Sequence, residues 1–231
     1  QKIGPTDIMK AREEIPEDQL LDVGIQVFES EKITEKQAKE EHTSPEVRKA
    51  ERHFIPYHLK NTLQQSSYWG TVRVLPTANI STDVLVQSKI LESNGQKLIL
   101  EIDVADATGE RWFKKKYIAE ASASSYSGSK VGEKDPYQYL YNTIANDMAE
   151  YKKNKSVTDI KTIRTVSKLK FAQEYAPDAF DGYLAQDEKE HLSIRRLPAS
   201  AHHHTSIRRP SSSESSNSCH CVASKCSSTR L

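Results

Sequence analysis

The sequence predicts an α+β fold: a two-layer α/β sandwich whose mixed sheet has a C-terminal antiparallel three-strand meander packed against two helices. Residues 83–118 indicate the meander, because apolar and polar residues alternate and turn residues separate three runs. Residues 44–63 and 135–151 indicate the helices, because apolar residues recur at helical spacing. Each helix and the sheet have one apolar face, so packing them together buries both.

A strand, a helix and a second strand are expected before the meander. Residues 20–28 alternate between apolar and polar positions, and residues 69–75 form a shorter strand-like run. Between them, Ser44 and Pro45 favour a helix start, because serine accepts a bond from a free amide and proline tolerates the first helical position. Pro56 lies inside the helical pattern, and we expect a kink there because proline has no amide hydrogen.

Two turns define the meander. Asn94 and Gly95 predict a type I′ turn, in which both central residues have positive φ. The second turn, at residues 106–109, places Gly109 in the left-handed conformation. Between the turns, one face of the middle strand is apolar, as expected for a half-buried sheet. These apolar positions are Leu98, Leu100, Ile102 and Val104.

The second helix should begin at Pro136, with Asp135 as its cap. Its apolar stripe consists of Tyr137, Leu140, Tyr141, Ile144, Ala145, Met148 and Tyr151. Residues 156–175 predict one further helix with β-branched apolar residues. We therefore divide the chain into an N-terminal linker at 1–19, an α/β sandwich domain at 20–152, a helical extension at 153–198 and a tail at 199–231.

The tail differs from the rest of the chain in composition. It is rich in serine and histidine and has no apolar periodicity, so it cannot bury enough surface to offset the entropy of ordering. We predict that it is disordered. Its bias towards serine, histidine, arginine and cysteine also suggests a frame-shifted or truncated gene, which sequencing of the locus would test.

Composition excludes some classes of protein. The formal net charge of the 231 residues is +1, so no overall field favours nucleic acid, and we predict no nucleic-acid partner. No apolar run approaches the roughly 20 residues that span a bilayer. All three cysteines lie in the tail, and a body without thiols is compatible with an envelope or secreted protein.

The meander carries a resemblance to known proteins. Residues 82–86 read Thr-Asp-Val-Leu-Val, and residues 104–112 read Val-Ala-Asp-Ala-Thr-Gly-Glu-Arg-Trp. These segments resemble a small α/β domain of Gram-negative envelope proteins, which include the curli-secretion lipoprotein CsgG, the penicillin-binding-protein activator LpoB and the N-terminal domain of TolB. Ser88 departs from that pattern, in which glycine is usual. The resemblance covers about residues 20–150 and implies an envelope protein.

The texture of the whole chain resembles an uncharacterised family of proteobacterial envelope lipoproteins. The segments that carry this likeness are residues 21–28, 45–51, 69–74 and 135–138. The resemblance implies a lipidated cysteine just upstream of Gln1 and a periplasmic domain anchored to the outer membrane. Because the chain starts without methionine, we expect a processed precursor or a trimmed chain.

No catalytic constellation is visible, and we predict a non-enzymatic protein without cofactor or metal. Asp22, Asp83 and Asp103 are the carboxylates that strand ends would bring together. His53 and His58 are five residues apart, which does not place two ligands on one helix face, so we interpret them as polar-face residues. Zinc binding by the tail's histidines and cysteines is disfavoured, because the cysteine spacing does not match a structural zinc site.

The favoured function is binding or scaffolding of an envelope protein partner. The candidate contact residues are Tyr126, Tyr137, Tyr139, Lys114 and Lys116. The alternative for the tyrosines is packing on a helix face, and for the lysines it is protection of an edge strand. A different function is a small-molecule or glycan binding domain, with residues 122–141 as a lid. Partner, ligand and oligomeric state are not identified by the sequence.

Overall fold

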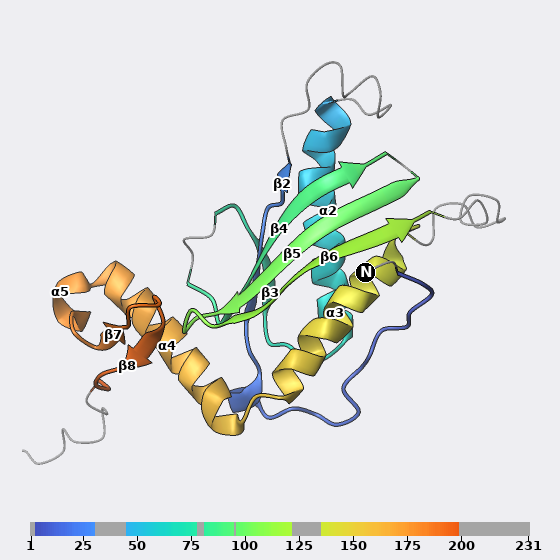
Figure 1. Ribbon diagram of the computed structural model, residues 1–231. Coiled ribbons are helices and arrows are strands. Elements are labelled where there is room, and N and C mark those ends of the chain that lie inside the picture. The colour runs from blue at the N-terminus through green and yellow to red at the C-terminus, as the bar shows by residue number, and fades with distance from the viewer. Residues whose placement is uncertain (1–2, 31–44, 78–80, 95, 122–134, 199–231) are drawn as a thin grey trace, which may run out of the picture. The chain divides into compact units, whose positions relative to one another are not determined.

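The computed structural model describes residues 3–30, 45–77, 81–94, 96–121 and 135–198 (Figure 1). The chain divides into two units, residues 1–197 and 198–231, and every element described here belongs to the first. The elements are η1 (Glu17–Gln19), β1 (Val23–Gln26), β2 (Glu29–Ser30), α2 (Pro45–Gln65), β3 (Val72–Leu75), β4 (Val84–Ser93), β5 (Lys97–Asp106), β6 (Arg111–Glu120), α3 (Gln138–Lys153), α4 (Val157–Tyr175), α5 (Pro177–Phe180), β7 (Leu184–Gln186) and β8 (Leu192–Ile194).

The main sheet is mixed, and its strand order is β3-β1-β4-β5-β6, with the short β2 also paired to β4. β1 is parallel to both β3 and β4, whereas β4, β5 and β6 form an antiparallel meander. α2 and α3 lie on the same face of this sheet (Figure 1). The predicted two-layer α/β sandwich is confirmed.

The core lies between the sheet and the two helices. Every second residue of β5 is buried, including all four apolar positions expected from the alternation. From the helices, Leu59 and Leu63 of α2 and Ile144 and Met148 of α3 are fully buried against this face. Each such side chain contributes roughly 1.5–3 kcal/mol through burial of apolar surface. Apolar periodicity therefore determines which faces meet.

Pro56 leaves a backbone carbonyl of α2 without its usual helical donor, and the segment after β1 donates to that carbonyl instead. The helix continues through Pro56, whose missing amide would have bonded to the carbonyl of Arg52. Instead, the Phe28 amide donates to this carbonyl at 3.3 Å, and Arg52 Nε donates to the Phe28 carbonyl at 2.9 Å. Two hydrogen bonds thus attach the chain after β1 to the middle of α2.

The two meander turns differ in how well the sequence predicted them. Gly109 has φ of +89°, as expected for the left-handed position. Asn94 has no positive φ, so the type I′ prediction is wrong at this residue; Gly95 lies outside the described residues. Instead, the Asn94 side chain accepts bonds from the amides of Gln96 and Lys97 at 3.1 and 2.8 Å. An asparagine side chain that mimics the backbone closes this turn.

α3 begins two residues later than the sequence predicted. Asp135 Oδ1 accepts a bond from the Tyr137 amide at 2.7 Å, and the Gln138 amide donates to the Asp135 carbonyl at 3.0 Å. Asp135 therefore stabilises a turn that precedes the helix, and Tyr137 occupies the N-cap position without a capping bond from its side chain. A local turn at Asp135 wins over a helix start at Pro136.

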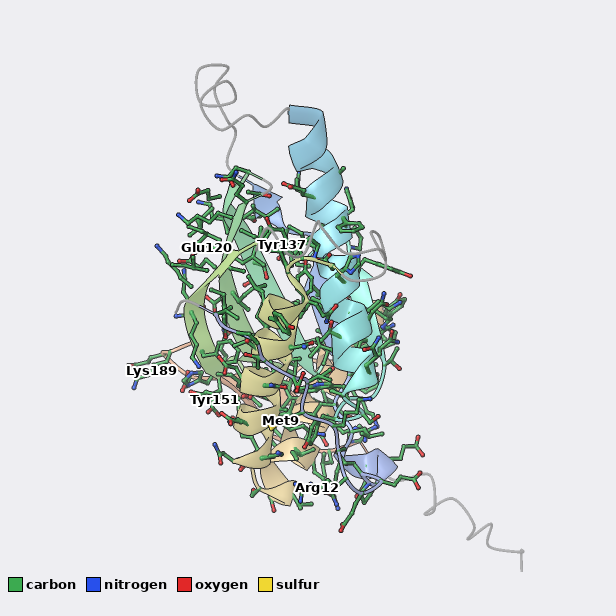
Figure 2. All side chains as sticks on the ribbon, turned by 90° about the vertical axis from the view of Figure 1, so that its right-hand side faces the viewer. Met9, Arg12, Glu120, Tyr137, Tyr151 and Lys189 are labelled. Atoms are coloured by element: carbon green, nitrogen blue, oxygen red, sulfur yellow. The ribbon has the colours of Figure 1, made fainter. Side chains whose placement is uncertain are left out.

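Residues 3–11 form an extended strap along α3, where the sequence suggested only a linker. Asn142 Nδ2 donates to the Thr6 carbonyl at 2.8 Å. Asn146 donates to the Asp7 carbonyl at 2.9 Å and accepts from the Met9 amide at 2.7 Å. Figure 2 labels Met9 on this strap and Tyr137 and Tyr151 near the two ends of α3. Two asparagines one helical turn apart therefore hold the strap.

The chain after α3 contains an expected helix and an unexpected hairpin. α4 starts with a capping box, in which the Ser156 and Asp159 side chains bond each other's backbone amides. β7 and β8 then form a two-stranded antiparallel sheet within the segment predicted to be helical. The Leu192 amide donates to the Thr108 carbonyl at 2.7 Å, so the hairpin docks on the second meander turn.

Candidate functional site

The predicted lysine contacts lie on the sheet face that the helices do not cover. Lys115 reaches the helix side, where its Nζ lies 2.9 Å from Asp147 of α3. Because side chains alternate along a strand, Lys114 and Lys116 lie on the opposite face. Lys114 forms an ion pair with Glu101 of β5 at 3.0 Å, and β6 is an edge strand of the sheet. This placement fits the edge-strand interpretation and leaves partner contact by these lysines untested.

The predicted tyrosine contacts do not behave alike. Tyr126 lies outside the described residues. Tyr137 is half-buried and packs against the core, whereas Tyr139 of α3 is 48% exposed. The next tyrosine, Tyr141, is buried, which raises the pKa of its hydroxyl well above the usual value. Among the predicted tyrosines that the structure describes, Tyr139 is therefore the one whose side chain is exposed to solvent.

The motif that carries the family resemblance locks the second hairpin. The buried carboxylate of Asp106 accepts bonds from the Thr108 amide at 2.9 Å and the Thr108 hydroxyl at 2.5 Å. Its second oxygen accepts the indole N–H of Trp112 at 2.8 Å. Gly109 supplies the left-handed residue between them. The roles that the structure shows for Asp106, Thr108, Gly109 and Trp112 are therefore structural.

Two of the three carboxylates expected to converge do so. Asp22 and Asp83 directly precede the parallel strands β1 and β4, and Asp83 Oδ2 accepts the Asp22 amide at 2.9 Å. Burial raises the pKa of Asp83, although its bond from the Asp22 amide acts in the opposite direction. Asp103 lies instead on the uncovered sheet face, where it pairs with Arg111 at 3.0 Å.

The Asp22 carboxylate also forms a hydrogen bond with the backbone. Its Oδ1 accepts the Thr71 amide at 2.7 Å. A Cβ atom at Gly70 would lie 2.5 Å from that oxygen, so the absence of a side chain at Gly70 lets the β3 segment approach. The Asp22 and Asp83 carboxylates thus join β1, β3 and β4 at the edge where these strands start.

An exposed aromatic surface lies on α2, and the sequence interpretation did not identify it. Phe54, Tyr57 and His58 share one face of the helix, and we name them the α2 aromatic surface. The Phe54 and Tyr57 side chains are 55% and 53% exposed. The signal in the sequence was the spacing 54, 57 and 58, which places residues on one helix face beside the core stripe. Interpreting His58 as a polar-face residue hid it.

The α2 aromatic surface is held in place from below. The His58 ring lies 4.1 Å from the Phe54 ring and 5.9 Å from the buried Tyr141 ring, centroid to centroid. His58 Nδ1 also lies 3.6 Å from Asp135 Oδ2. Just beyond, Gln138 Nε2 of α3 donates to Thr62 Oγ1 of α2 at 3.0 Å. Exposed rings are thus supported by a stacked ring, a carboxylate and a neighbouring helix.

The described residues hold neither a metal-binding cluster nor a helix that could cross a membrane. Within those ranges, no group of three or more histidine, cysteine, aspartate or glutamate side chains is arranged to hold a metal ion. The histidines and cysteines of the tail lie outside them. Among the described helices, none combines the length and apolarity needed to cross a bilayer.

Comparisons with known proteins give only distant structural neighbours. No family model matches the chain, and no curated protein matches it. The hypothetical protein CT253 from Chlamydia trachomatis aligns with a TM-score of 0.37 and 14% identity, covering 58% of this chain and 99% of its own. The DUF330 protein XCC0632 from Xanthomonas campestris aligns with a TM-score of 0.28 and 8% identity, covering 77% of this chain and 99% of its own. These TM-scores are too low to indicate a function.

Proposed function

We propose that this protein is a non-enzymatic module that binds a protein partner through the α2 aromatic surface. The observation that carries the proposal is the joint exposure of Phe54 and Tyr57 on a rigid support. Large aromatic side chains are enriched at the centres of protein interfaces, because they bury much area at little cost in side-chain entropy. Tyr139, predicted from the sequence, belongs to the same two-helix layer.

The support beneath the rings favours binding. A side chain that is already fixed loses little conformational freedom when a partner covers it. The Phe54 ring contacts the His58 ring in a tilted arrangement, and Lys60 Nζ lies 5.4 Å from the centroid of the Tyr57 ring. Lys60 lies beside Tyr57, whereas Asp135 lies beside His58, so the rim carries charges of both signs. The partner surface that fits has an apolar depression with polar and charged side chains around it.

The location that we propose is the periplasmic side of the cell envelope, with an outer-membrane lipid anchor upstream of residue 1. The support is the resemblance of the meander and of the whole chain to envelope lipoproteins. Fractionation of the source cells tests it: the protein should sediment with outer membranes and be released by detergent. Recovery in the cytosolic fraction would contradict this location.

Binding is tested by affinity capture from envelope fractions under native and cross-linking conditions. The full chain should recover one defined protein, and the double variant Phe54→Ser/Tyr57→Ser should lose at least about 90% of it, as expected when two central interface residues are removed. The matched control is Phe171→Ser/Tyr175→Ser, which changes two exposed aromatics on α4.

The outcomes separate the proposal from nonspecific adhesion. Equal recovery by the two double variants and the unchanged chain would show that the α2 aromatic surface is not the binding site. Absence of any recovered protein, with cross-linking included, would contradict the protein-binding function itself. Circular dichroism and a thermal melt of each variant confirm that the fold is intact.

A further inference from the structure

A pocket of about 200 Å³ lies where α3 ends and α4 begins. Ile15 and Gln19 come from the segment before β1, and Tyr68 comes from the segment after α2. Lys152 and Lys153 at the end of α3 and Lys155 just after it complete the lining, together with Val157 and Ile160 of α4. Elements far apart in the sequence thus form a small pocket that is basic on one side and apolar on the other.

Lys152 is the unusual member of this group, because its side chain is almost entirely buried, with 5% exposure. Its ammonium donates to the Tyr68 carbonyl at 2.5 Å and lies 5.5 Å from the centroid of the Trp69 ring. A lysine ammonium has three N–H donors. Among the described residues, the Tyr68 carbonyl is the one acceptor it reaches, and no carboxylate forms an ion pair with it.

The two neighbouring lysines add charge with incomplete compensation. Lys153 Nζ lies 5.0 Å from the centroid of the Tyr68 ring and 3.8 Å from Met9 Sδ, and within the described ranges it has no ion pair. Lys155 Nζ is neutralised by Glu110 at 2.6 Å, with Asp106 at 3.9 Å. Among the described residues, no acidic side chain lines the pocket. The ammonium groups of Lys152 and Lys153 therefore have no counter-charge there, and a ligand with a negative group would supply one.

The helix dipole offers a structural explanation for these lysines. Cationic side chains in the last turn of a helix are favourable, because they face the negative end of the helix dipole. That effect is available to an exposed lysine and does not require burial. Burying an ammonium without a counter-charge is costly, which here lowers the pKa of Lys152 to about 8. A lysine retained at such a cost beside a pocket suggests a use for its charge.

We propose that this pocket binds a small amphipathic anion, one carboxylate or phosphate group on a short hydrocarbon chain. The charged group is held by Lys152 and Lys153, and the hydrocarbon lies against Ile15, Val157 and Ile160. The apolar wall is what distinguishes such a ligand from inorganic phosphate. This binding site uses none of the residues of the α2 aromatic surface. Anion binding and the proposed protein binding can therefore be confirmed or contradicted independently of each other.

Tryptophan fluorescence is a direct probe of this pocket. The chain has two tryptophans, Trp69 next to Lys152 and Trp112 at 6.2 Å from Trp69 between ring centroids. The full chain is titrated with hexanoate, hexyl phosphate, hexan-1-ol and inorganic phosphate at constant ionic strength. We expect a saturable change with at least one of the two amphipathic anions, and at least tenfold weaker binding of hexanol and inorganic phosphate.

Three variants test the assignment to the lysines. Lys153→Gln changes an exposed residue, so it should fold normally, and it should weaken binding of the amphipathic anion about tenfold, the effect of losing about 1.4 kcal/mol. Lys152→Gln should weaken it at least as much. The control Lys170→Gln removes an exposed lysine of α4 that does not line the pocket, and it should bind like the unchanged chain.

The proposal fails under any of three results. These are no saturable change with either amphipathic anion, equal binding of hexanol or inorganic phosphate, or unchanged binding by Lys153→Gln. The phosphate and carboxylate arms further distinguish which head group the lysines prefer. A thermal melt with each ligand separates binding to the folded chain from an effect on fluorescence alone.

Discussion

At the scale of the residue, buried ionisable groups here are mostly committed to the backbone. Asp22, Asp83 and Asp106 each accept backbone amide bonds at one edge of the sheet, and Asp106 also holds Trp112. Such carboxylates stabilise the strand ends and turns. Lys152 differs from these carboxylates, because among the described residues its buried ammonium has one hydrogen-bond acceptor and no ion pair, which is why it points to a ligand.

Replacing Asp106 should destabilise the protein strongly. In Asp106→Ala, the buried indole N–H of Trp112 and the Thr108 amide lose their acceptor, and each unsatisfied donor costs about 1–3 kcal/mol. We expect a loss of about 2–4 kcal/mol in urea unfolding. Asp103→Ala removes a surface ion pair instead and should cost less than about 1 kcal/mol. Equal losses would contradict the lock on the hairpin.

Asp83 should make stability depend on acidity. Burial raises its pKa in the folded state above the unfolded value, so folding favours the protonated carboxyl. The stabilising contribution is complete below the unfolded pKa and is lost as the pH rises through the folded pKa. Asp83→Asn keeps an acceptor for the Asp22 amide but does not titrate. Urea unfolding from about pH 4 to pH 7 should therefore show a smaller loss of stability in the variant than in the unchanged chain.

Lys152 should make the stability of the fold depend on pH in the alkaline range. Its folded pKa of about 8 is below the unfolded value, so folding favours the neutral amine. Stability from this group is present at high pH and is lost as the pH falls through about 8. Between pH 8 and pH 10, the unchanged chain should gain up to about 3 kcal/mol relative to Lys152→Met. A constant difference between the two unfolding curves would show that the lysine is not desolvated.

At the scale of the element, hydrogen bonds between segments far apart in the sequence hold the fold together alongside the helices and strands. The strap at residues 3–11 depends on Asn142 and Asn146, and the chain after β1 depends on the Arg52 carbonyl that Pro56 leaves free. Periodicity predicted the strands and both helices of the sandwich, because burial on one face imposes it. It could not predict the strap or the β7–β8 hairpin, because both depend on contacts with residues far along the chain.

The strap can be released by two substitutions. Asn142→Ala/Asn146→Ala removes three hydrogen bonds to the strap, each contributing about 0.5–1.5 kcal/mol. We expect trypsin to cleave after Lys10 and Arg12 at least about tenfold faster in this variant, because local opening exposes the backbone. The control, Gln173→Ala, changes an exposed residue of α4. Unchanged cleavage would mean that the strap is held by other contacts.

At the scale of the whole molecule, the fold was predictable and the candidate site was not. The alternation in the meander and the stripes at 44–63 and 135–151 were sufficient for the two-layer sandwich, since each apolar face needs a cover. Of the predicted tyrosine contacts that the structure describes, Tyr139 has an exposed side chain and Tyr137 is half-buried. The helical spacing placed Phe54 in the apolar stripe and did not single out Tyr57, because exposure depends on which helix face the sheet covers, and that follows only from the assembled layers.

The central claim is that the α2 aromatic surface binds a protein. Its most direct test replaces Tyr57 with a photo-cross-linking amino acid in the full chain, expressed in the source cells, with the same replacement at Phe171 as the control. Irradiation should attach one discrete protein to the chain from position 57 and none from position 171. Cross-linking that is equal at both positions, or absent at position 57, would contradict the claim.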